Sequence, residues 1–190
     1  MHLTLYTDYT LRVMMYLAVK YGSGEVATIH EMAQAYGISR NHLTKIVNEL
    51  AQNGFIETTR GRSGGARLAR RPSEISVGSL VRMAEKDFAI VQCHTTSRDA
   101  NCVILPACNL RNGLRRAADA FLYELDKMTL ADSIIAPSVA ASILNIRLSG
   151  SREVTVPLTA ISRKPRSAPE SRSPQPRAGK RARGRSASTR

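Results

Sequence analysis

The sequence has no tryptophan, few aromatic residues and only three cysteines. With aromatic residues at 5% and apolar residues at 43%, any core must be mostly aliphatic. No apolar run approaches the roughly 18 residues that a membrane-spanning helix needs, and the N-terminus has no charged lead-in or small-residue cleavage site of a signal peptide. We therefore expect a cytoplasmic protein without a membrane segment, in which clustered cysteines serve metal or redox chemistry rather than disulfides.

Acidic residues are also scarce, with 15 Asp and Glu against 28 Lys and Arg and a net charge of +13. Residues 151–190 hold 11 of the basic residues and only two acids, together with five of the eight prolines. Such a segment cannot bury enough apolar surface to offset its ordering entropy. We expect residues 136–190 to form a basic Pro/Ser/Arg-rich tail that is largely disordered beyond residue 150.

Signatures of catalysis are missing as well. No nucleophile–base set is evident, and the glycine-rich run RGRSGGAR at 60–67 lacks the Lys-Ser/Thr pair of a Walker-type phosphate loop. The sequence therefore favours a binding protein over an enzyme.

The N-terminal part has the element order of a winged helix-turn-helix. A first helix is expected to start at Thr7 and Asp8, a second spans about 28–36, and Ser39 caps a third with apolar residues at helical spacing. Two extended runs around a glycine-rich turn then predict a β-hairpin. The expected fold is mainly α, with a DNA-binding domain at 1–74 that carries a two-stranded β wing.

The second helix of such a motif enters the major groove with its first residues nearest the base edges. Here those residues are polar, and the hairpin that follows is rich in arginine without any acid, which suits DNA phosphates. Taken alone, the hairpin would equally fit a solvated basic turn. The predicted DNA-contacting residues are Thr28, Ser39, Arg40, Asn41, His42 and Lys45 in the helices and Arg60, Arg62, Ser63, Gly64 and Gly65 in the wing.

Residues 75–135 are expected to hold a linker helix at about 76–85, a cysteine-bearing loop and a long helix after Cys108. Apolar residues recur along that helix at spacings of three and four, close to a coiled-coil seam: Leu110, Leu114, Ala117, Phe121, Leu125 and Met128. This stripe fits either a core contact within one chain or a two-fold dimer interface.

The three cysteines, Cys93, Cys102 and Cys108, lie within 16 residues at the spacing Cys-x8-Cys-x5-Cys. This spacing is neither the Cys-x2-Cys pair of a zinc ribbon nor the redox Cys-x-x-Cys motif. Thiolates suit iron–sulfur clusters, zinc or copper(I). The clustering predicts a metal site with a fourth position still to be filled, and a zinc or thiol-redox site in a constitutive DNA-binding or interaction protein stays open.

Several segments together resemble the Rrf2-type winged-helix repressors, and most of all those that sense nitric oxide. They are MHLTLYTDYTLRVMMYLA, YGISRNHLTKIVNELAQNGFIETTRGRSGGARL, CVILPACNLRNGLRRA and YELDKMTLADSI, and the resemblance covers about residues 1–135. It implies a homodimer on a pseudo-palindromic double-stranded DNA operator and nitric oxide as effector. It further implies an iron–sulfur cluster on Cys93, Cys102 and Cys108, with a 4Fe–4S cluster favoured over 2Fe–2S.

The same resemblance makes Asp8 a candidate fourth ligand, contributed across the dimer. From the residues alone, the favoured interpretation of Asp8 is a first-turn acid stabilised by the helix dipole. The interval between Cys93 and Cys102 is longer than is usual in the family, and the histidine that some members place after the third cysteine is absent. His94 is a conceivable substitute ligand. An iron-responsive repressor of the same architecture is the alternative function, and an aspartate at position 8 favours nitric oxide.

Overall fold

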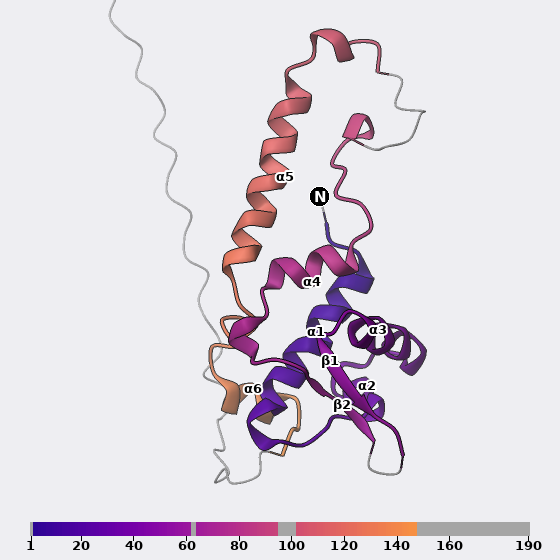
Figure 1. Cartoon of the computed structure of the whole chain (residues 1–190), viewed down its shortest axis with the longest axis vertical. Helices are drawn as coiled ribbons and strands as arrows, with labels where there is room; N and C mark the ends of the chain where they lie inside the picture. Colours follow the sequence, from indigo (N-terminus) through magenta and orange to yellow (C-terminus); the bar gives the residue numbers. More distant parts are fainter. Residues whose placement is uncertain (1, 62–63, 95–101, 148–190) are drawn as a thin grey trace, which may run out of the picture. The chain divides into compact units, whose positions relative to one another are not determined.

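The computed structural model describes residues 2–61, 64–94 and 102–147 (Figure 1). These residues belong to one compact unit within Met1–Val156. The wing residues Arg62 and Ser63 lie outside the described residues, and so does the segment beyond residue 150 that was expected to be disordered.

Helix α1, Leu5–Lys20, is the element around which the others pack, and it is followed by a 3-10 turn at Tyr21–Ser23. It begins two residues before the start predicted at Thr7. Thr4 is the N-cap, and its side chain accepts a hydrogen bond from the Thr7 N–H. Thr7 is instead a buried residue of the first turn.

The helix-turn-helix consists of α2, Ile29–Tyr36, and α3, Arg40–Gln52. Thr28 and Glu31 form a reciprocal capping box at the start of α2. Gly37 ends this helix at φ +65°, a left-handed conformation that glycine adopts without a Cβ penalty. Ser39 caps α3 as predicted, because its side chain accepts a hydrogen bond from the His42 N–H at 3.4 Å.

The wing is an antiparallel pair of strands, β1, Ile56–Thr59, and β2, Gly65–Leu68. Ile56 pairs with Leu68 at the base and Thr59 with Gly65 near the tip. Ala27, just before α2, bridges Ala66 through two backbone hydrogen bonds of 2.8 Å. The wing and the helix-turn-helix are therefore tied together through main-chain atoms, and the predicted winged helix is confirmed.

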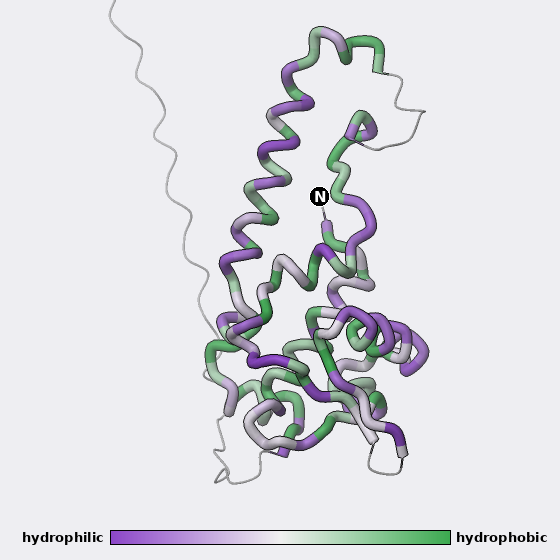
Figure 2. The backbone as a smooth tube through the Cα atoms, in the orientation of Figure 1, coloured by the Kyte–Doolittle hydropathy of each residue, from purple (hydrophilic) through white to green (hydrophobic). Residues whose placement is uncertain are grey.

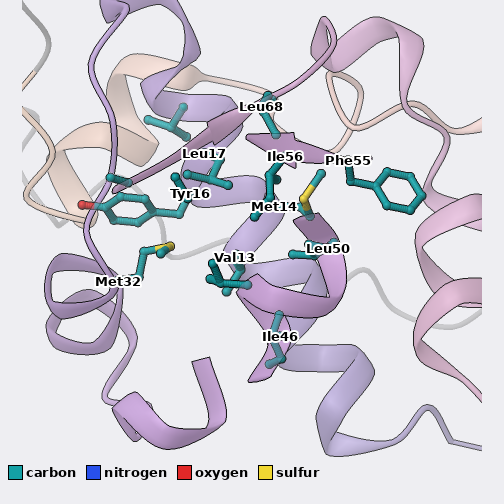
Figure 3. Packing of buried hydrophobic residues seen from close by; sticks show 14 of the residues in the cluster. Val13, Met14, Tyr16, Leu17, Met32, Ile46, Leu50, Phe55, Ile56 and Leu68 are labelled. Carbon is teal, nitrogen blue, oxygen red and sulfur yellow. The ribbon is translucent and has the colours of Figure 1, made fainter. Parts of the chain in front are cut away.

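One aliphatic core holds this unit together. Val13, Met14 and Leu17 of α1 meet Ile46 and Leu50 of α3 in its centre (Figure 3). Ile56 and Leu68 from the two strands close one side of the cluster, as the same view shows. Because this core fixes the inner face of α3, the opposite face of that helix is left on the surface.

A second group of elements follows the wing: a 3-10 turn at Pro72–Glu74, α4, Val77–Ala84, short 3-10 turns at Gln92–His94 and Leu105–Ala107, and α5, Leu110–Lys127. The chain after α5 returns to α4 through an isolated bridge between Ser76 and Thr129. Val77 N–H donates to the Met128 carbonyl and Leu130 N–H to the Ile75 carbonyl, both at 2.8 Å. The C-terminal end of α5 is thus joined to the start of α4.

Helix α6, Pro137–Ile143, was not predicted from the sequence. It packs against α1, where Ala141 is buried together with Ile146 of the following turn. Helices of the described ranges are all too short or too polar to cross a membrane.

Candidate DNA interface and cysteine segment

The N-terminal half of α3 presents its polar residues to solvent. Leu43, Ile46 and Val47 are buried against α1, whereas Arg40, Asn41, His42 and Lys45 are all exposed. The structure therefore places the helix residues predicted to read DNA on one accessible surface. Thr28 lies apart from them, at the start of α2, where its hydroxyl accepts the Glu31 N–H at 3.1 Å.

Sequence reasoning missed two further residues of this surface, Thr44 and Asn48. Both are exposed, and they follow Asn41 at i+3 and i+7, so they share its face of the helix. The Thr44 hydroxyl donates to the Arg40 carbonyl at 2.8 Å. The apolar residues of α3 recur at helical spacing, and the positions between them that face away from the core could have identified Thr44 and Asn48.

The wing requires glycine at its different positions for different structural reasons. Gly61 adopts a φ of +111°, which suits glycine. At Gly64 a Cβ would lie 2.4 Å from the Thr59 carbonyl oxygen, and at Gly65 it would lie 2.7 Å from the Ala27 carbonyl oxygen. Close approach of other backbone atoms, and not a positive φ, accounts for Gly64 and Gly65.

The arginines of the wing are not equivalent. Arg67 forms an ion pair of 2.7 Å with Glu57, its cross-strand partner. The Arg70 guanidinium lies 5.6 Å from the centre of the Phe55 ring. Arg60 is exposed at the end of β1, where the chain enters the tip of the hairpin. Of the described wing arginines, Arg60 is therefore the one placed best to reach a phosphate.

The cysteine segment is only partly described. Cys93 lies half-buried in the turn Gln92–His94, Cys108 is half-buried just before α5, and Cys102 is exposed. The Arg111 carbonyl can only accept, so His94 Nε2 donates to it across 2.9 Å. This contact places Cys93 beside the first turn of α5, the turn that Cys108 precedes.

Three thiols in this segment suit the thiolate chemistry of an iron–sulfur centre. Within the ranges that the structure describes, however, no three His, Cys, Asp or Glu side chains are grouped closely enough to hold a metal ion. Asp8, the candidate fourth ligand, pairs with Arg12 of its own helix at 2.8 Å. The donor types therefore fit a cluster, while one described chain leaves the donors apart.

The start of α1 is connected to the residue that follows α4. Glu85 Oε1 accepts hydrogen bonds from the Thr4 N–H at 2.6 Å and from the Thr7 hydroxyl at 2.7 Å. A carboxylate at a helix N-terminus is stabilised by the unpaired N–H groups and the helix dipole. The chain that leads to Cys93 starts directly after Glu85, so this contact links the cysteine segment to α1.

The same turn of α1 also contacts α3. The Tyr6 hydroxyl donates to the Glu49 carboxylate, and the Tyr9 ring lies 6.1 Å from the His42 ring. Burial, followed by the hydrogen bond and charge of Glu49, raises the pKa of Tyr6 above its ordinary value. In the sequence, Asp8 lies between Tyr6 and Tyr9. The candidate ligand therefore belongs to the turn of α1 that contacts α3.

Helix α5 is not part of the core. None of its residues is buried, and Leu110 and Tyr123 are 68% and 60% exposed. Along the helix, hydrophobic and hydrophilic residues alternate (Figure 2). Three residues of the apolar stripe, Leu114, Phe121 and Leu125, are half-buried, and α5 contacts α4, so packing within the chain accounts for part of the stripe.

A winged helix with an exposed polar face on α3 is the DNA-binding unit of a transcriptional regulator. The family described as Rrf2, iron-dependent transcriptional regulator, matches residues 3–135, and the chain belongs to this family. It is 46% identical over 134 residues to the HTH-type transcriptional regulator NsrR of Bacillus subtilis (strain 168), covering 70% of this chain and 90% of that protein. The NsrR of Geobacillus kaustophilus is 44% identical, with 77% and 99% covered.

Solved structures agree with this assignment. CymR, the global cysteine regulator of B. subtilis, superposes with a TM-score of 0.56 at 28% identity, covering 70% of this chain and 95% of that one. IscR of T. potens gives a TM-score of 0.55 at 25% identity, with 70% and 86% covered. The protein is thus a DNA-binding transcriptional repressor and not an enzyme, as the sequence predicted.

Proposed function

We propose that the protein is a homodimeric repressor that senses nitric oxide through an iron–sulfur cluster held by Cys93, Cys102 and Cys108. The observation that carries this proposal is that the start of α1 makes two contacts. The Thr4 N–H donates to Glu85, which precedes the cysteine segment, and the Tyr6 hydroxyl donates to Glu49 of α3. Likeness to the NsrR regulators supports the choice of effector. Asp8 would supply the fourth ligand from the partner subunit, and a 4Fe–4S cluster is favoured.

A cluster held by Cys93, Cys102 and Cys108 would supply iron able to react with nitric oxide. The residues of this chain carry the effect onward. A ligand shifts a conformational equilibrium only through its different interactions with the two states. A displacement of the segment after Glu85, or of Asp8, alters the first turn of α1, and Tyr6 and Tyr9 pass the displacement to α3.

The apolar stripe of α5, whose residues are exposed or half-buried within one chain, provides the dimer interface in this proposal. Its spacing is that of a helix seam, and its C-terminal end is fixed to α4 by backbone hydrogen bonds. Two copies joined along α5 would hold two α3 helices at a defined separation, as a pseudo-palindromic operator requires. Loss of that separation on reaction with nitric oxide would release the DNA.

Iron availability is a second candidate signal, and the description of the matching family as iron-dependent favours it. One experiment separates the two. Protein purified without oxygen is titrated on its operator with nitric oxide and, separately, with an iron chelator. We expect stoichiometric nitric oxide to release the DNA while the chelator acts slowly. Release by the chelator alone would establish an iron sensor, and a colourless protein with one zinc per chain would exclude the cluster.

We expect Asn41→Ala to weaken operator binding roughly 5- to 150-fold, the equivalent of about 1–3 kcal/mol for a bidentate contact to adenine. Discrimination should be lost at one base pair in each half-site. Gln52→Ala, at the opposite end of α3, is the matched control and should bind normally. Fluorescence anisotropy with single-base operator variants measures both effects, and unchanged discrimination by Asn41→Ala would remove Asn41 from the base-reading surface.

Replacing Asp8 tests the fourth ligand. Asp8→Ala is expected to lower the iron and sulfide content and to change the visible absorption spectrum. Arg12→Ala is its control, because it removes the same ion pair and keeps the carboxylate. An exposed i,i+4 pair stabilises a helix by only about 0.3–0.5 kcal/mol, so neither variant should unfold. Identical spectra for both variants and the unaltered protein would return Asp8 to the role of a first-turn acid.

A further inference from the structure

A surface hollow of about 530 Å³ lies where α1, α2 and the turn after α6 meet. Its volume is within the range of roughly 300–1,000 Å³ in which proteins bind small molecules. The walls combine two cations, two carboxylates, a hydroxyl group and an apolar side chain, which come from Lys20, Arg147, Glu25, Glu31, Tyr16 and Ile146. None of the described lining residues belongs to α3 or to the cysteine segment, so the hollow is separate from both candidate sites.

Tyr16 brings a hydroxyl group to this hollow. The residue is only 3% exposed, and its ring meets the Tyr36 ring edge-on at 6.2 Å. Its side chain points away from Met14 and Leu50, with the hydroxyl oxygen at the outer end (Figure 3). A buried tyrosine hydroxyl usually has a partner, yet this one makes no hydrogen bond within the part of the chain that the structure describes. Burial, and then the charge of Glu31, raise the pKa of Tyr16, so the hydroxyl keeps its proton and can donate it to a ligand.

Lys20 and two carboxylates form the charged part of the hollow. Lys20 is buried, and its ammonium group donates to the Val26 carbonyl at 2.9 Å. The same group lies 3.4 Å from a Glu31 oxygen and 3.6 Å from a Glu25 oxygen. One lysine therefore balances only one of the two negative charges. An ionised carboxylate can accept up to about four hydrogen bonds, so both can accept further protons from a bound ammonium group.

The turn after α6 adds a second cation and an apolar wall. The chain reverses at Asn145, whose φ is +53°, and the Ile146 N–H donates to the Ala141 carbonyl at 2.8 Å. This bond holds the buried Ile146 in place, and the next residue, Arg147, is exposed and forms no ion pair with any described residue. A guanidinium group can bind a carboxylate through two parallel hydrogen bonds. Arg147 is therefore available for the carboxylate of a ligand.

This turn lies beyond the part of the chain that the family shares. The Rrf2 family matches residues 3–135, whereas α6 and the turn at 144–147 follow that range. Membership of the family therefore assigns no function to the hollow.

We propose that this hollow binds a free α-amino acid with an apolar side chain. The ammonium group of the ligand contacts Glu25 and Glu31, its carboxylate accepts hydrogen bonds from Arg147 and the Tyr16 hydroxyl, and its side chain lies against Ile146. A zwitterion matches the hollow because the two cations and two carboxylates of the lining balance each other. A simple anion would meet two carboxylates, and a simple amine would meet two cations.

The test is isothermal titration calorimetry of the full-length protein with L-valine, L-leucine, L-isoleucine, L-methionine and L-phenylalanine. We expect at least one of them to bind with a Kd of about 1 mM or tighter. Analogues of that amino acid without the ammonium group or without the carboxylate should bind about tenfold more weakly or worse, because each loses hydrogen bonds to charged groups. For L-leucine these analogues are 4-methylpentanoate and 3-methylbutylamine. The titration needs neither DNA nor a cluster, so its result is independent of the proposed sensing function.

Two substitutions locate the ligand in the hollow. Tyr16→Phe should weaken binding roughly 2- to 12-fold, the value of one hydrogen bond. It should leave the thermal unfolding midpoint of the free protein unchanged, because the hydroxyl makes no hydrogen bond within the described ranges. Arg147→Gln should weaken binding about tenfold or more, since it removes a hydrogen bond between charged groups. Tyr36→Phe is the matched control and should bind normally, because Tyr36 packs on the Tyr16 ring but does not line the hollow.

Three results would overturn the proposal. The first is no binding of any of the five amino acids at concentrations up to about 10 mM. The second is equal binding of the analogue without the ammonium group, which would make the hollow a site for anions. The third is unaltered affinity in both Tyr16→Phe and Arg147→Gln, which would place the ligand elsewhere on the protein.

Discussion

Serine in place of Cys93, Cys102 or Cys108 is expected to yield a colourless protein that no longer responds to nitric oxide. Each change removes one thiolate from a set of three, and iron–sulfur clusters are held by such thiolates. Operator affinity should fall toward the nonspecific level, roughly 10³-fold or more below the specific one. Iron and sulfide analysis, visible absorption and operator binding under anaerobic conditions measure the three effects.

Folding should survive these substitutions, since the three cysteines are exposed or half-buried and surface changes usually alter stability by less than about 0.5 kcal/mol. Asn109→Ala is the control within the same segment. It removes no thiolate, and the exposed Asn109 side chain makes no capping hydrogen bond to α5, so the cluster should persist. A Cys102→Ser protein that keeps its iron and its colour would refute the three-cysteine site.

A methyl group at residue 78 is expected to separate α5 from α4. The Cβ of Gly78→Ala would lie 2.0 Å from Asp126 Oδ1 and 2.8 Å from the Asp126 backbone nitrogen. The Asp126 carboxylate is held there by Arg82, whose hydrogen bonds lower its pKa. Overpacking of this kind destabilises proteins by about 1–3 kcal/mol. Denaturant unfolding should report that loss, and sedimentation should show weaker association of the dimer that we propose along α5.

Gly113→Ala is the matched control, because it lies in α5 where the nearest atom, an Arg116 side-chain nitrogen, is 4.0 Å from the added Cβ. It should stabilise the protein by about 0.5–1 kcal/mol through helix propensity. The double variant Gly78→Ala with Asp126→Ala should recover only part of the loss, since the backbone nitrogen remains in place. Wild-type stability for Gly78→Ala alone would show that the joint between the helices is loose.

The parts of the fold that were predicted correctly depend on local signals. Ser39 caps α3 in the structure as the sequence predicted, and the strands on either side of the glycine-rich run pair as a hairpin. The start of α1 was predicted two residues too late. Thr7 is a residue type that often caps helices, but its hydroxyl instead donates a hydrogen bond to Glu85, 78 residues away in the sequence. Helix α6 was missed because its apolar residues find their partners on α1 and not in their own segment.

In the candidate site, too, local signals predicted some residues, while contacts between residues distant in the chain could not be predicted. The position at the start of the second helix of the motif identified Asn41 and Lys45, whereas the buried spacing of α3, followed to the end of the helix, would have identified Asn48. The cysteine spacing named donor atoms, yet their assembly depends on residues distant in the chain and, in our proposal, on a second copy. Such contacts leave no periodic trace in a single sequence.

In the wing, the residues that determine the backbone path differ from the residue that provides the positive charge. Gly64 and Gly65 admit no side chain because carbonyl oxygens of Thr59 and Ala27 occupy the space, whereas Arg60 is exposed and meets no such restriction. Mutational tolerance should therefore be uneven over a few neighbouring positions, with the backbone path invariant and the number of cations free to vary. Selection can therefore raise or lower the affinity of the repressor for DNA in small steps. The fold of the wing stays the same.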